Sequence, residues 1–370
     1  MGKRPSKNEG GDGKNPIGKK PFDNNNIKKS LGLDGQNVKD KELSWIPFKQ
    51  GFYDAVGLPG VPRGYVTQFR GFSDVGKSTA IYETIVGAQK LGDYIVIFDT
   101  EKSFDWEHAK LVGFKFEEIV DEETGEVISY DGDDFVYFDG SDLLNMFATY
   151  NYKESKDTTK PLRFIPVVED IARAMNLILD KQAKGELERN ITFVWDSIGS
   201  IGCFEAAVSN SNNNMWTAGA LKREFESILN FRIPASRRET SPFINTFVTV
   251  QKIWLKPNPV GQPTIMQNGG EGFKYGVRLN FHLGGKTTSS SKKKEVTRDG
   301  KTYNYGIEVD IECFKNHVNG IEKQGRIAST AHGYWNPDKL DEYKKQYADF
   351  LIEKLNSSGS SISEDSEEID

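Results

Sequence analysis

The residues whose types and spacing most clearly suggest a chemical role form one short run, Gly71-Phe72-Ser73-Asp74-Val75-Gly76-Lys77-Ser78, with Thr79 following it. The run matches the phosphate-binding pattern G-x-x-x-x-G-K-[ST] at every fixed position. Its glycines let backbone N–H groups surround a phosphate chain, and a following helix adds the positive end of its dipole. We expect Lys77 to reach the β- and γ-phosphates of ATP and the Ser78 hydroxyl to bind Mg²⁺. A chance glycine turn is the alternative.

Acidic side chains follow two apolar runs that we expect to be strands. Asp196 comes directly after residues 191–195, and Glu101 follows residues 94–98 with Asp99 between. Phosphoryl transfer to water needs a carboxylate that positions the metal and a base that orients the attacking water. We assign Asp196 to the metal, with a helix cap as its alternative role. Glu101 and Asp99 are rivals for the base, and spacing alone does not choose between them.

A glutamine stands at the expected end of a fourth strand. Gln251 follows the apolar run 245–250. A neutral amide in this place can hydrogen-bond a γ-phosphate and lose that partner after hydrolysis, which would make it a switch. The alternative is an ordinary polar residue at the start of a loop.

The elements that must position these groups alternate along the chain. Apolar runs at 65–69, 94–98, 191–195 and 245–250 are separated by helical patterns at 78–91, 105–112, 166–184 and 216–231. Buried β-branched and aromatic runs joined by helices predict an α/β fold with a mostly parallel central sheet flanked by helices. Ligands bind beyond the carboxyl ends of such strands, which is where the candidate residues stand.

Composition and charge limit the class of protein. The 370 residues contain two cysteines, which are too few for a disulfide framework. The four histidines do not have the spacing of zinc ligands. No apolar run is long enough to span a membrane, so we expect a cytoplasmic protein without a membrane partner. The net charge of −6 is unevenly distributed. We predict a disordered basic arm at 1–40, a core at 41–335, an amphipathic helix within 336–356 and a flexible acidic tail at 357–370.

These motifs, in this order, resemble the RecA family of homologous-recombination ATPases, most closely its phage (UvsX-like) and bacterial branches. The resemblance covers about residues 51–330 and adds a lead-in to the phosphate loop at 57–64. Residues 98–105 resemble the segment with the family's catalytic glutamate, which favours Glu101 over Asp99. Val194-Trp195-Asp196-Ser197 is similar to the second Walker motif, and Val250-Gln251-Lys252 to the segment with the switch glutamine. The resemblance therefore implies a RecA-like P-loop ATPase core.

The resemblance also assigns residues around the nucleotide. Asp105 and His108 fall where the family contacts adenine. Residues 314–317 resemble a segment whose pair of cations reaches the ATP of a neighbouring protomer. Lys315 fits the first cation, whereas His317 departs from the pattern at the second. A further departure is the stretch at about 116–162, which is longer than the connection usual in the family.

For DNA, the resemblance points to the segment after Gln251, where the family has a mobile loop that closes on a pair of glycines. Here the loop would span 252–268 and close on Gly269 and Gly270. Cations can hold phosphates while apolar side chains stack on bases. The candidates in the loop are Lys252, Ile253, Trp254 and Lys256. A shorter DNA loop is expected at 199–214, and Lys222 and Arg223 beyond it are weaker candidates, with a solvated helix face as their alternative.

The function implied is that of a DNA-dependent ATPase that uses ATP and Mg²⁺. It would coat single-stranded DNA as a helical filament and promote pairing and strand exchange with double-stranded DNA, with loading or single-strand-binding proteins as partners. One alternative is another RecA-core motor such as a DnaB-type helicase. A second alternative is an accessory protein that binds ATP but hydrolyses it weakly. The departure at His317 favours this alternative, whereas the presence of all the nucleotide-site motifs argues against it.

Overall fold

The computed structural model describes residues 24–32, 39–209, 214–258, 261, 263–267 and 270–357. The chain divides into two compact units, residues 1–39 and 40–370. Within the expected basic arm, the structure describes helix α1 (Asn24–Ser30), which the sequence pattern did not indicate. The rest of the arm up to residue 23, and the acidic tail beyond 357, lie outside the described residues.

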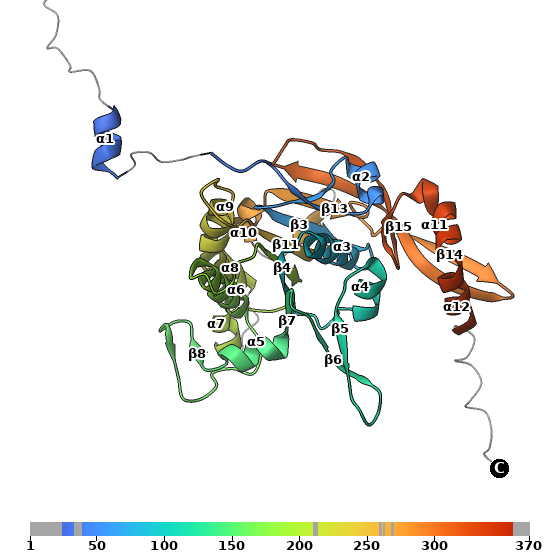
Figure 1. Cartoon of the computed structure of the whole chain (residues 1–370), viewed down its shortest axis with the longest axis horizontal. Coiled ribbons are helices and arrows are strands. Elements are labelled where there is room, and N and C mark those ends of the chain that lie inside the picture. Colours follow the sequence, from blue (N-terminus) through green and yellow to red (C-terminus); the bar gives the residue numbers. More distant parts are fainter. Residues whose placement is uncertain are drawn as a thin grey trace, which may run out of the picture. The chain divides into compact units, whose positions relative to one another are not determined.

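A large sheet forms the centre of the second unit (Figure 1). The strands β13, β3, β11, β10, β4 and β7 run parallel to their neighbours, and β15, β16 and β17 continue the sheet in antiparallel pairs. In spatial order the strands are β17 (Gly333–Trp335), β16 (Gln324–Thr330), β15 (Lys301–Asn316), β13 (Leu279–Leu283), β3 (Val66–Gly71), β11 (Asn245–Lys256), β10 (Ile191–Asp196), β4 (Tyr94–Asp99) and β7 (Phe135–Asp139). The expected α/β fold is confirmed.

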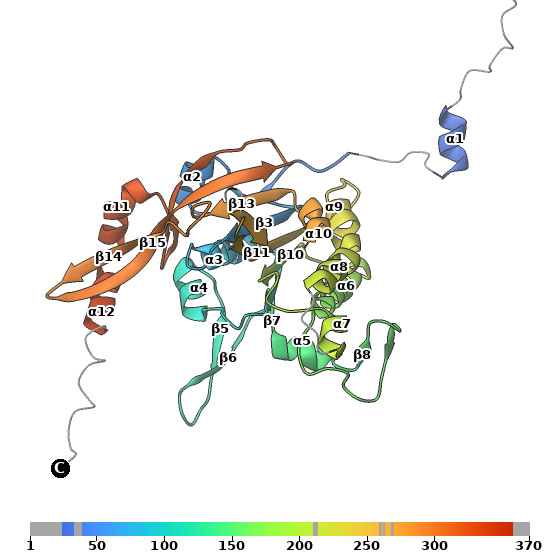
Figure 2. The ribbon, with the colours of Figure 1, turned by 180° about the vertical axis from the view of Figure 1, so that it is seen from behind.

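Helices cover both faces of this sheet (Figures 1 and 2). Side chains alternate between the faces along each strand, so Val194 packs in one core layer and Phe193 and Trp195 in the other. One layer contains α2 (Gln50–Val56), α3 (Lys77–Lys90) and α4 (Trp106–Val112), together with the short strand pair β1 (Trp45–Pro47) and β2 (Gly60–Pro62). The other contains α5 (Gly140–Phe147), α6 (Val168–Ala183), α7 (Phe204–Ser209), α8 (Asn214–Ser227) and α9 (Ile233–Ala235), with a π-helix at Ile228–Arg232 between the last two.

The prediction of one amphipathic helix within 336–356 is wrong. A 3₁₀ turn (Pro337–Lys339) leads into α11 (Leu340–Gln346) and then α12 (Ala348–Ser357), with the break at Tyr347. The Tyr347 ring stacks on His332 with 3.6 Å between ring centroids, a contact that the sequence of the helix itself does not specify. The apolar stripe does face a core, because Leu340, Tyr343 and Leu351 pack against β15 and β16. Beside them, β14 (Lys292–Arg298) pairs with β15.

The long stretch at 116–162 contributes a strand that the sequence analysis missed. An antiparallel hairpin of β5 (Glu117–Val120) and β6 (Val127–Asp131) leads into β7, which pairs in parallel with β4. A short pair, β8 (Tyr150–Asn151) and β9 (Lys156–Asp157), follows α5. Arg163 then forms a buried ion pair with Asp170 of α6, and the Tyr152 hydroxyl donates to the same carboxylate at 2.7 Å. The insertion is thus built into the sheet.

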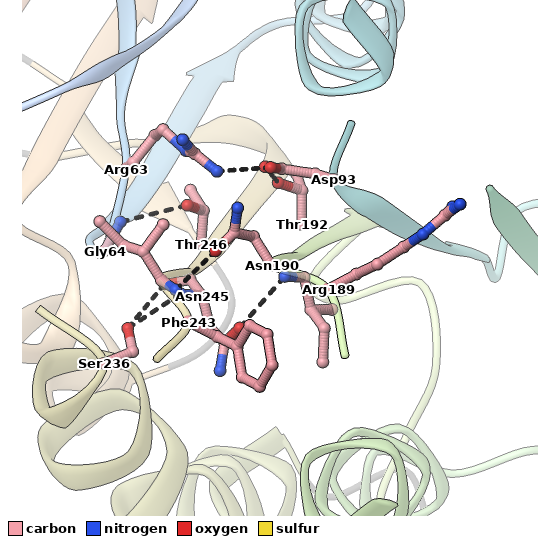
Figure 3. A network of polar contacts seen from close by, with 12 residues as sticks. Arg63, Gly64, Asp93, Arg189, Asn190, Thr192, Ser236, Phe243, Asn245 and Thr246 are labelled. Atoms are coloured by element: carbon pink, nitrogen blue, oxygen red, sulfur yellow. Dashed lines mark hydrogen bonds and ion pairs between the residues drawn. The ribbon is translucent and has the colours of Figure 1, made fainter. Parts of the chain in front are cut away.

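A polar network lies at the amino-terminal ends of β4, β10 and β11 (Figure 3). Asp93 accepts a hydrogen bond from Arg63 at 2.5 Å and from the Thr192 hydroxyl at 2.8 Å. Asn245 donates its backbone N–H to the Ser236 hydroxyl at 2.9 Å. The contacts of Asp93 join segments far apart in sequence, at the edge opposite to the phosphate loop. Over the part of the chain that the structure describes, every helix is too short or too polar to cross a bilayer.

Candidate nucleotide site and adjoining ribbon

The phosphate loop connects the end of β3 at Gly71 to the start of α3 at Lys77, as expected. Asp74 and Gly76 both adopt left-handed backbone conformations, with φ of 57° and 80°. A Cβ atom on Gly76 would lie 2.7 Å from the Cβ of Ser329, and one on Gly71 would lie 2.5 Å from the Leu283 carbonyl oxygen. The two fixed glycines of the motif are therefore required by the close approach of β13 and β16.

Residues from the far end of the chain hold this loop in place. The Tyr334 hydroxyl donates to the carbonyl oxygen of Gly76 at 2.8 Å, and the hydroxyls of Thr79 and Ser329 are 2.6 Å apart. Thr79 is buried and its hydroxyl is engaged with Ser329, so its contact to a nucleotide would come from the backbone. Neither Ser329 nor Tyr334 could be predicted as a partner of the loop, because nothing in the local sequence indicates that β16 and β17 reach it.

Lys77 and the acidic candidates converge at the carboxyl ends of β3, β10 and β4. Burial lowers the pKa of Lys77, and the carboxylates of Asp196 and Glu101 oppose this change. Burial, reinforced by repulsion from Glu101 and Asp99, raises the pKa of Asp196 to about 7, against the attraction of Lys77. The Lys77 ammonium donates to the Phe72 carbonyl at 2.5 Å. Negative charge is therefore concentrated where a cation would be favourable.

The donor set at this place fits Mg²⁺ that is bound together with phosphates. Ser78 is exposed at the start of α3, and Asp196 ends β10. Among the described residues, no group of three or more His, Cys, Asp or Glu side chains could hold a metal by itself. Mg²⁺ usually keeps several waters and takes one or two protein ligands plus substrate phosphates, which matches a hydroxyl and a single carboxylate.

Asp99 and Glu101 differ sharply in their surroundings. The buried Asp99 carboxylate accepts the backbone N–H groups of Glu101 and Ser103 at 3.2 Å and of Phe104 at 2.9 Å. It also accepts the Tyr137 hydroxyl at 2.8 Å. Asp99 therefore shapes the turn after β4, while the exposed Glu101 carboxylate accepts a hydrogen bond from the Ser197 hydroxyl.

Gln251 is buried beside the phosphate loop. It pairs with Arg70 across β11 and β3, one residue before the Lys252–Gly71 pair, and its side chain is only 1% exposed. Its carbonyl oxygen accepts a hydrogen bond from the Gln68 amide at 2.8 Å. Lys252 is near enough to Lys77 to contribute to the lowering of the Lys77 pKa. The glutamine is therefore close to where a terminal phosphate would lie.

The prediction that the strand ends at Gln251 is wrong. β11 continues to Lys256 and pairs with β12 (Thr264–Gln267) in antiparallel register, from Ile253 opposite Gln267 to Lys256 opposite Thr264. Residues 252–256 and 264–267 thus form a two-stranded ribbon. α10 (Gly270–Gly276) follows it.

The residues of the ribbon that are candidates for DNA binding differ in their exposure. Lys252, Trp254 and Lys256 are exposed, with Trp254 at 40%. Ile253, expected to contact DNA, is instead buried at 1%, because strand alternation turns it to the opposite face. Gly269 lies outside the described residues, and Gly270 begins α10.

The other DNA candidates lie in or near α8. The expected loop at 199–214 is described except for residues 210–213. On α8, Lys222 is exposed, whereas the Arg223 guanidinium pairs with Glu224 at 2.6 Å and Glu169 at 3.7 Å. The ion pairs of Arg223 favour a structural role over a DNA contact.

The expected adenine contacts lie at the start of α4. Asp105 accepts the backbone N–H of His108 at 2.9 Å and so caps this helix. The His108 ring nitrogen is 3.2 Å from the Thr330 carbonyl oxygen, next to Ser329, which touches the phosphate loop. Its ring lies 4.8 Å from that of Tyr82, and burial lowers its pKa. His108 is thus on the side of the loop formed by β16.

Lys315 and His317 lie away from the phosphate loop of their own chain. Lys315 is opposite Asn280, which pairs with Gln68 in β3, so it sits before the carboxyl end of that strand. The His317 backbone N–H donates to the Arg278 carbonyl at 2.9 Å, farther still toward the amino-terminal ends of β13 and β3. The Lys315 ammonium donates to the Lys274 carbonyl at 2.8 Å, at the end of α10.

Part of the chain is similar in sequence to known proteins. Residues 23–129 match the family model described as the RecA N-terminal domain. A plasmid RecA protein of Lactococcus lactis subsp. lactis is 32% identical over 92 residues, 24% of this chain and 27% of the relative. RecA of Ureaplasma parvum serovar 3 is 34% identical over 83 residues, 22% and 25% of the two chains. RecA of Aquifex aeolicus is 31% identical over 99 residues, 25% and 29% of the two chains. The matched region spans between a quarter and a third of the length of these curated relatives, and over that region the chain is similar to RecA proteins.

Proposed function

We propose that this protein is an ATP-driven DNA recombinase, which coats single-stranded DNA as a helical filament and promotes homologous pairing and strand exchange with double-stranded DNA. The observation that carries the proposal is the course of β11. This strand passes the phosphate loop at Gln251 and continues without interruption into the ribbon, where Lys252, Trp254 and Lys256 are exposed. A nucleotide site and a surface suited to DNA are therefore parts of one strand.

In the proposed reaction, Lys77 and the N–H groups of the phosphate loop bind the phosphates of ATP. Ser78 and Asp196 would hold Mg²⁺, which when bound neutralises charge that develops on the phosphates. Glu101 orients a water molecule and accepts its proton. The assignment of Glu101 is supported by Asp99, because the oxygens of Asp99 are already occupied by backbone N–H groups and the Tyr137 hydroxyl.

Single-stranded DNA would bind along the exposed side of the ribbon. Trp254 offers a ring on which a base can stack, and the lysines on either side of it offer charge to the phosphates. Met266 lies directly opposite Trp254 in the register and extends this apolar surface. The pattern is a stacking platform between cations.

The position of Lys315 and His317 supports the proposed filament. Both lie toward the ends of β13 and β3 that point away from the chain's own phosphate loop. If these side chains serve a nucleotide, it is the nucleotide of a second copy. Loading and single-strand-binding proteins, and a cytoplasmic setting, are proposed on the family resemblance alone.

The experiment is steady-state ATP hydrolysis with and without single-stranded DNA, using Lys77→Ala as the blank. Lys90→Ala, at the far end of the same helix, is the matched control and should behave like the wild type. Strong stimulation by single strands that is lost in Lys77→Ala supports the proposal. Turnover that is indifferent to DNA points to a helicase-type motor, which a forked-duplex unwinding assay identifies. The absence of turnover leaves an ATP-binding accessory protein.

A further inference from the structure

A cavity of about 430 Å³ lies where the β8–β9 hairpin (residues 150–157) meets helices α6 and α8. Its walls include Tyr150 and Ser155 of the hairpin, Arg173 and Asn176 of α6, and Arg223 of α8. The volume is within the range of ligand sites, roughly 300–1,000 Å³. None of the residues assigned to the nucleotide lines this cavity. It is therefore a separate site, and half of its wall comes from the long stretch at 116–162.

The Arg173 guanidinium has a stacking partner but, within the described part of the chain, no carboxylate partner. Its Cζ lies 3.6 Å from the centroid of the Tyr150 ring. Its Nε is buried and, over the same residues, has no hydrogen-bond partner. Other arginines in this region, Arg163, Arg223 and Arg232, each pair with a carboxylate. Stacking uses the flat face of a guanidinium and leaves its edge to donate to an anion.

Two carboxylates also line the cavity, and an arginine is already paired with each. Asp180 accepts from Arg232 at 2.7 Å, and Glu224 accepts from Arg223 at 2.6 Å. These ion pairs leave the charge of Arg173 uncompensated by the carboxylates that line the cavity. A half-buried and uncompensated cation attracts an anion more strongly than one in open solvent does.

Neutral donors stand beside this charge. Arg232 donates to the backbone oxygen of Asn176 at 3.2 Å and to its side-chain oxygen at 2.8 Å. Because arginine has donors only, the Asn176 amide has its oxygen toward Arg232, and its NH₂ group is left as a donor. Asn176 is three residues after Arg173 on α6, so the two side chains are neighbours. Ser155 adds a hydroxyl from the hairpin.

We propose that this cavity binds a phosphate group. Arg173 supplies the positive charge and a pair of N–H donors, and Asn176 and Ser155 supply neutral donors. A phosphate group offers three acceptor oxygens, one for each of these residues. A carboxylate offers two, so it would leave one of the donors unused.

The phosphate can come from the DNA backbone or from a free phosphate compound. The hairpin packs against α7, as both views of the ribbon show (Figures 1 and 2). The Tyr152 ring lies 5.5 Å from that of Phe204, and Lys153 pairs with Glu205 at 3.2 Å. Since α7 belongs to the expected short DNA loop at 199–214, a strand held there would pass near the cavity. The DNA source rests on the proposed function, whereas the cavity itself does not.

The test measures the affinity of the full-length protein for inorganic phosphate by titration calorimetry at constant ionic strength. All proteins carry Lys77→Ala, so that the phosphate loop contributes little and equally. Arg173→Met keeps most of the side-chain length and removes the charge. We expect it to lower the affinity about tenfold or more, since a hydrogen bond to a charged group is lost. Arg189→Met is the matched control, because Arg189 is an exposed arginine outside the cavity, and it should leave the affinity unchanged.

A second variant keeps the proposal testable if Arg173→Met does not fold, which its unfolding midpoint reports. Asn176→Asp retains an acceptor for Arg232 but replaces the NH₂ donor with an oxygen that Arg173 can pair with. It should therefore abolish phosphate binding. Acetate is the comparison ligand and should bind at least tenfold more weakly than phosphate. Acetate bound as tightly as phosphate, unchanged affinity in both variants, or no phosphate binding by the parent protein would each overturn the proposal.

A second titration, with Lys77 intact, identifies the source of the phosphate. Binding of a fluorescent oligothymidylate is measured over a series of salt concentrations. If Arg173→Met makes the salt dependence shallower by about one counterion, the cavity holds a DNA phosphate. If the dependence is unchanged while inorganic phosphate is lost, the ligand is a free phosphate compound; both results support the phosphate site. If the wild type does not bind DNA, the proposed function fails, and the calorimetry still decides the cavity.

Discussion

The Ser197 hydroxyl donates a hydrogen bond to the Glu101 carboxylate and so joins the residues that follow β10 and β4. These strands are adjacent, with Asp196 opposite Asp99 at their ends. Asp196, the proposed metal ligand, lies beside the phosphate loop, and the residue after it, Ser197, holds the carboxylate of Glu101, the proposed base. The position of Glu101 therefore depends on a strand about a hundred residues away in the sequence.

Ser197→Ala should slow turnover without weakening ATP binding. Without the Ser197 hydroxyl, the Glu101 carboxylate is no longer held in one orientation. A hydrogen bond to a charged group contributes about 1.5–3 kcal/mol. We expect kcat to fall roughly tenfold while KM for ATP stays the same. Steady-state hydrolysis measures both values. Ser103→Ala, an exposed serine on the same turn, is the control, and an unchanged kcat in Ser197→Ala would contradict the positioning role.

Changes in the ribbon should separate stacking from charge. Trp254→Ala should weaken binding to single-stranded DNA about tenfold at every salt concentration, since base stacking on an aromatic ring contributes roughly 1–3 kcal/mol. Lys256→Ala should instead make the salt dependence shallower by about one counterion. Fluorescence titrations over a series of salt concentrations distinguish the two effects. The buried Ile253 is the comparison, because Ile253→Val should affect mainly stability. A Trp254→Ala variant with wild-type affinity would rule out stacking on this residue.

The ion pair between Arg163 and Asp170 should be important for stability. Both side chains are fully buried, so Arg163→Met leaves a buried carboxylate without its counter-charge. We expect the free energy of unfolding to fall by about 3 kcal/mol or more, measured by urea denaturation. Arg232→Met breaks a more exposed pair with Asp180 and should cost less than about 1 kcal/mol. Equal losses in the two variants would contradict this account.

His332 should make the fold sensitive to acid. Burial, with repulsion from Lys49 and His108, lowers the pKa of His332 from its usual 6.5 to about 4. Between these values the unfolded chain binds a proton that the folded chain does not, so stability is full above pH 6.5 and is lost as the pH falls toward 4. The loss between pH 7 and pH 5 should be about 2 kcal/mol.

The measurement is urea unfolding of the wild type and of His332→Asn at both pH values. Groups that titrate elsewhere contribute equally to both proteins, so the difference between them isolates His332. The variant should lose less stability than the wild type on acidification. Equal losses of stability in the two proteins would show that His332 is not the group responsible. The His332 ring also stacks on Tyr347 and contacts the Tyr343 hydroxyl at 3.0 Å.

Much of the fold could be predicted because its signals are local. The four apolar runs at 65–69, 94–98, 191–195 and 245–250 all became parallel strands of the central sheet, since continuous apolar sequence is what burial on both faces requires. The helix break at Tyr347 was not predictable in this way. At the break the Tyr347 ring stacks on His332, which belongs to a different segment of the chain.

The same division holds at the candidate site. By itself, the sequence determined the phosphate loop and the order of polar residues at the strand ends, because each motif is contiguous and parallel strands bring their carboxyl ends to one edge. Only the tertiary structure decided that Ser329 and Tyr334 hold the loop, that Ser197 reaches Glu101, and that β11 continues as a ribbon. These features depend on strand register and on packing between segments up to 258 residues apart, and local sequence does not specify either one.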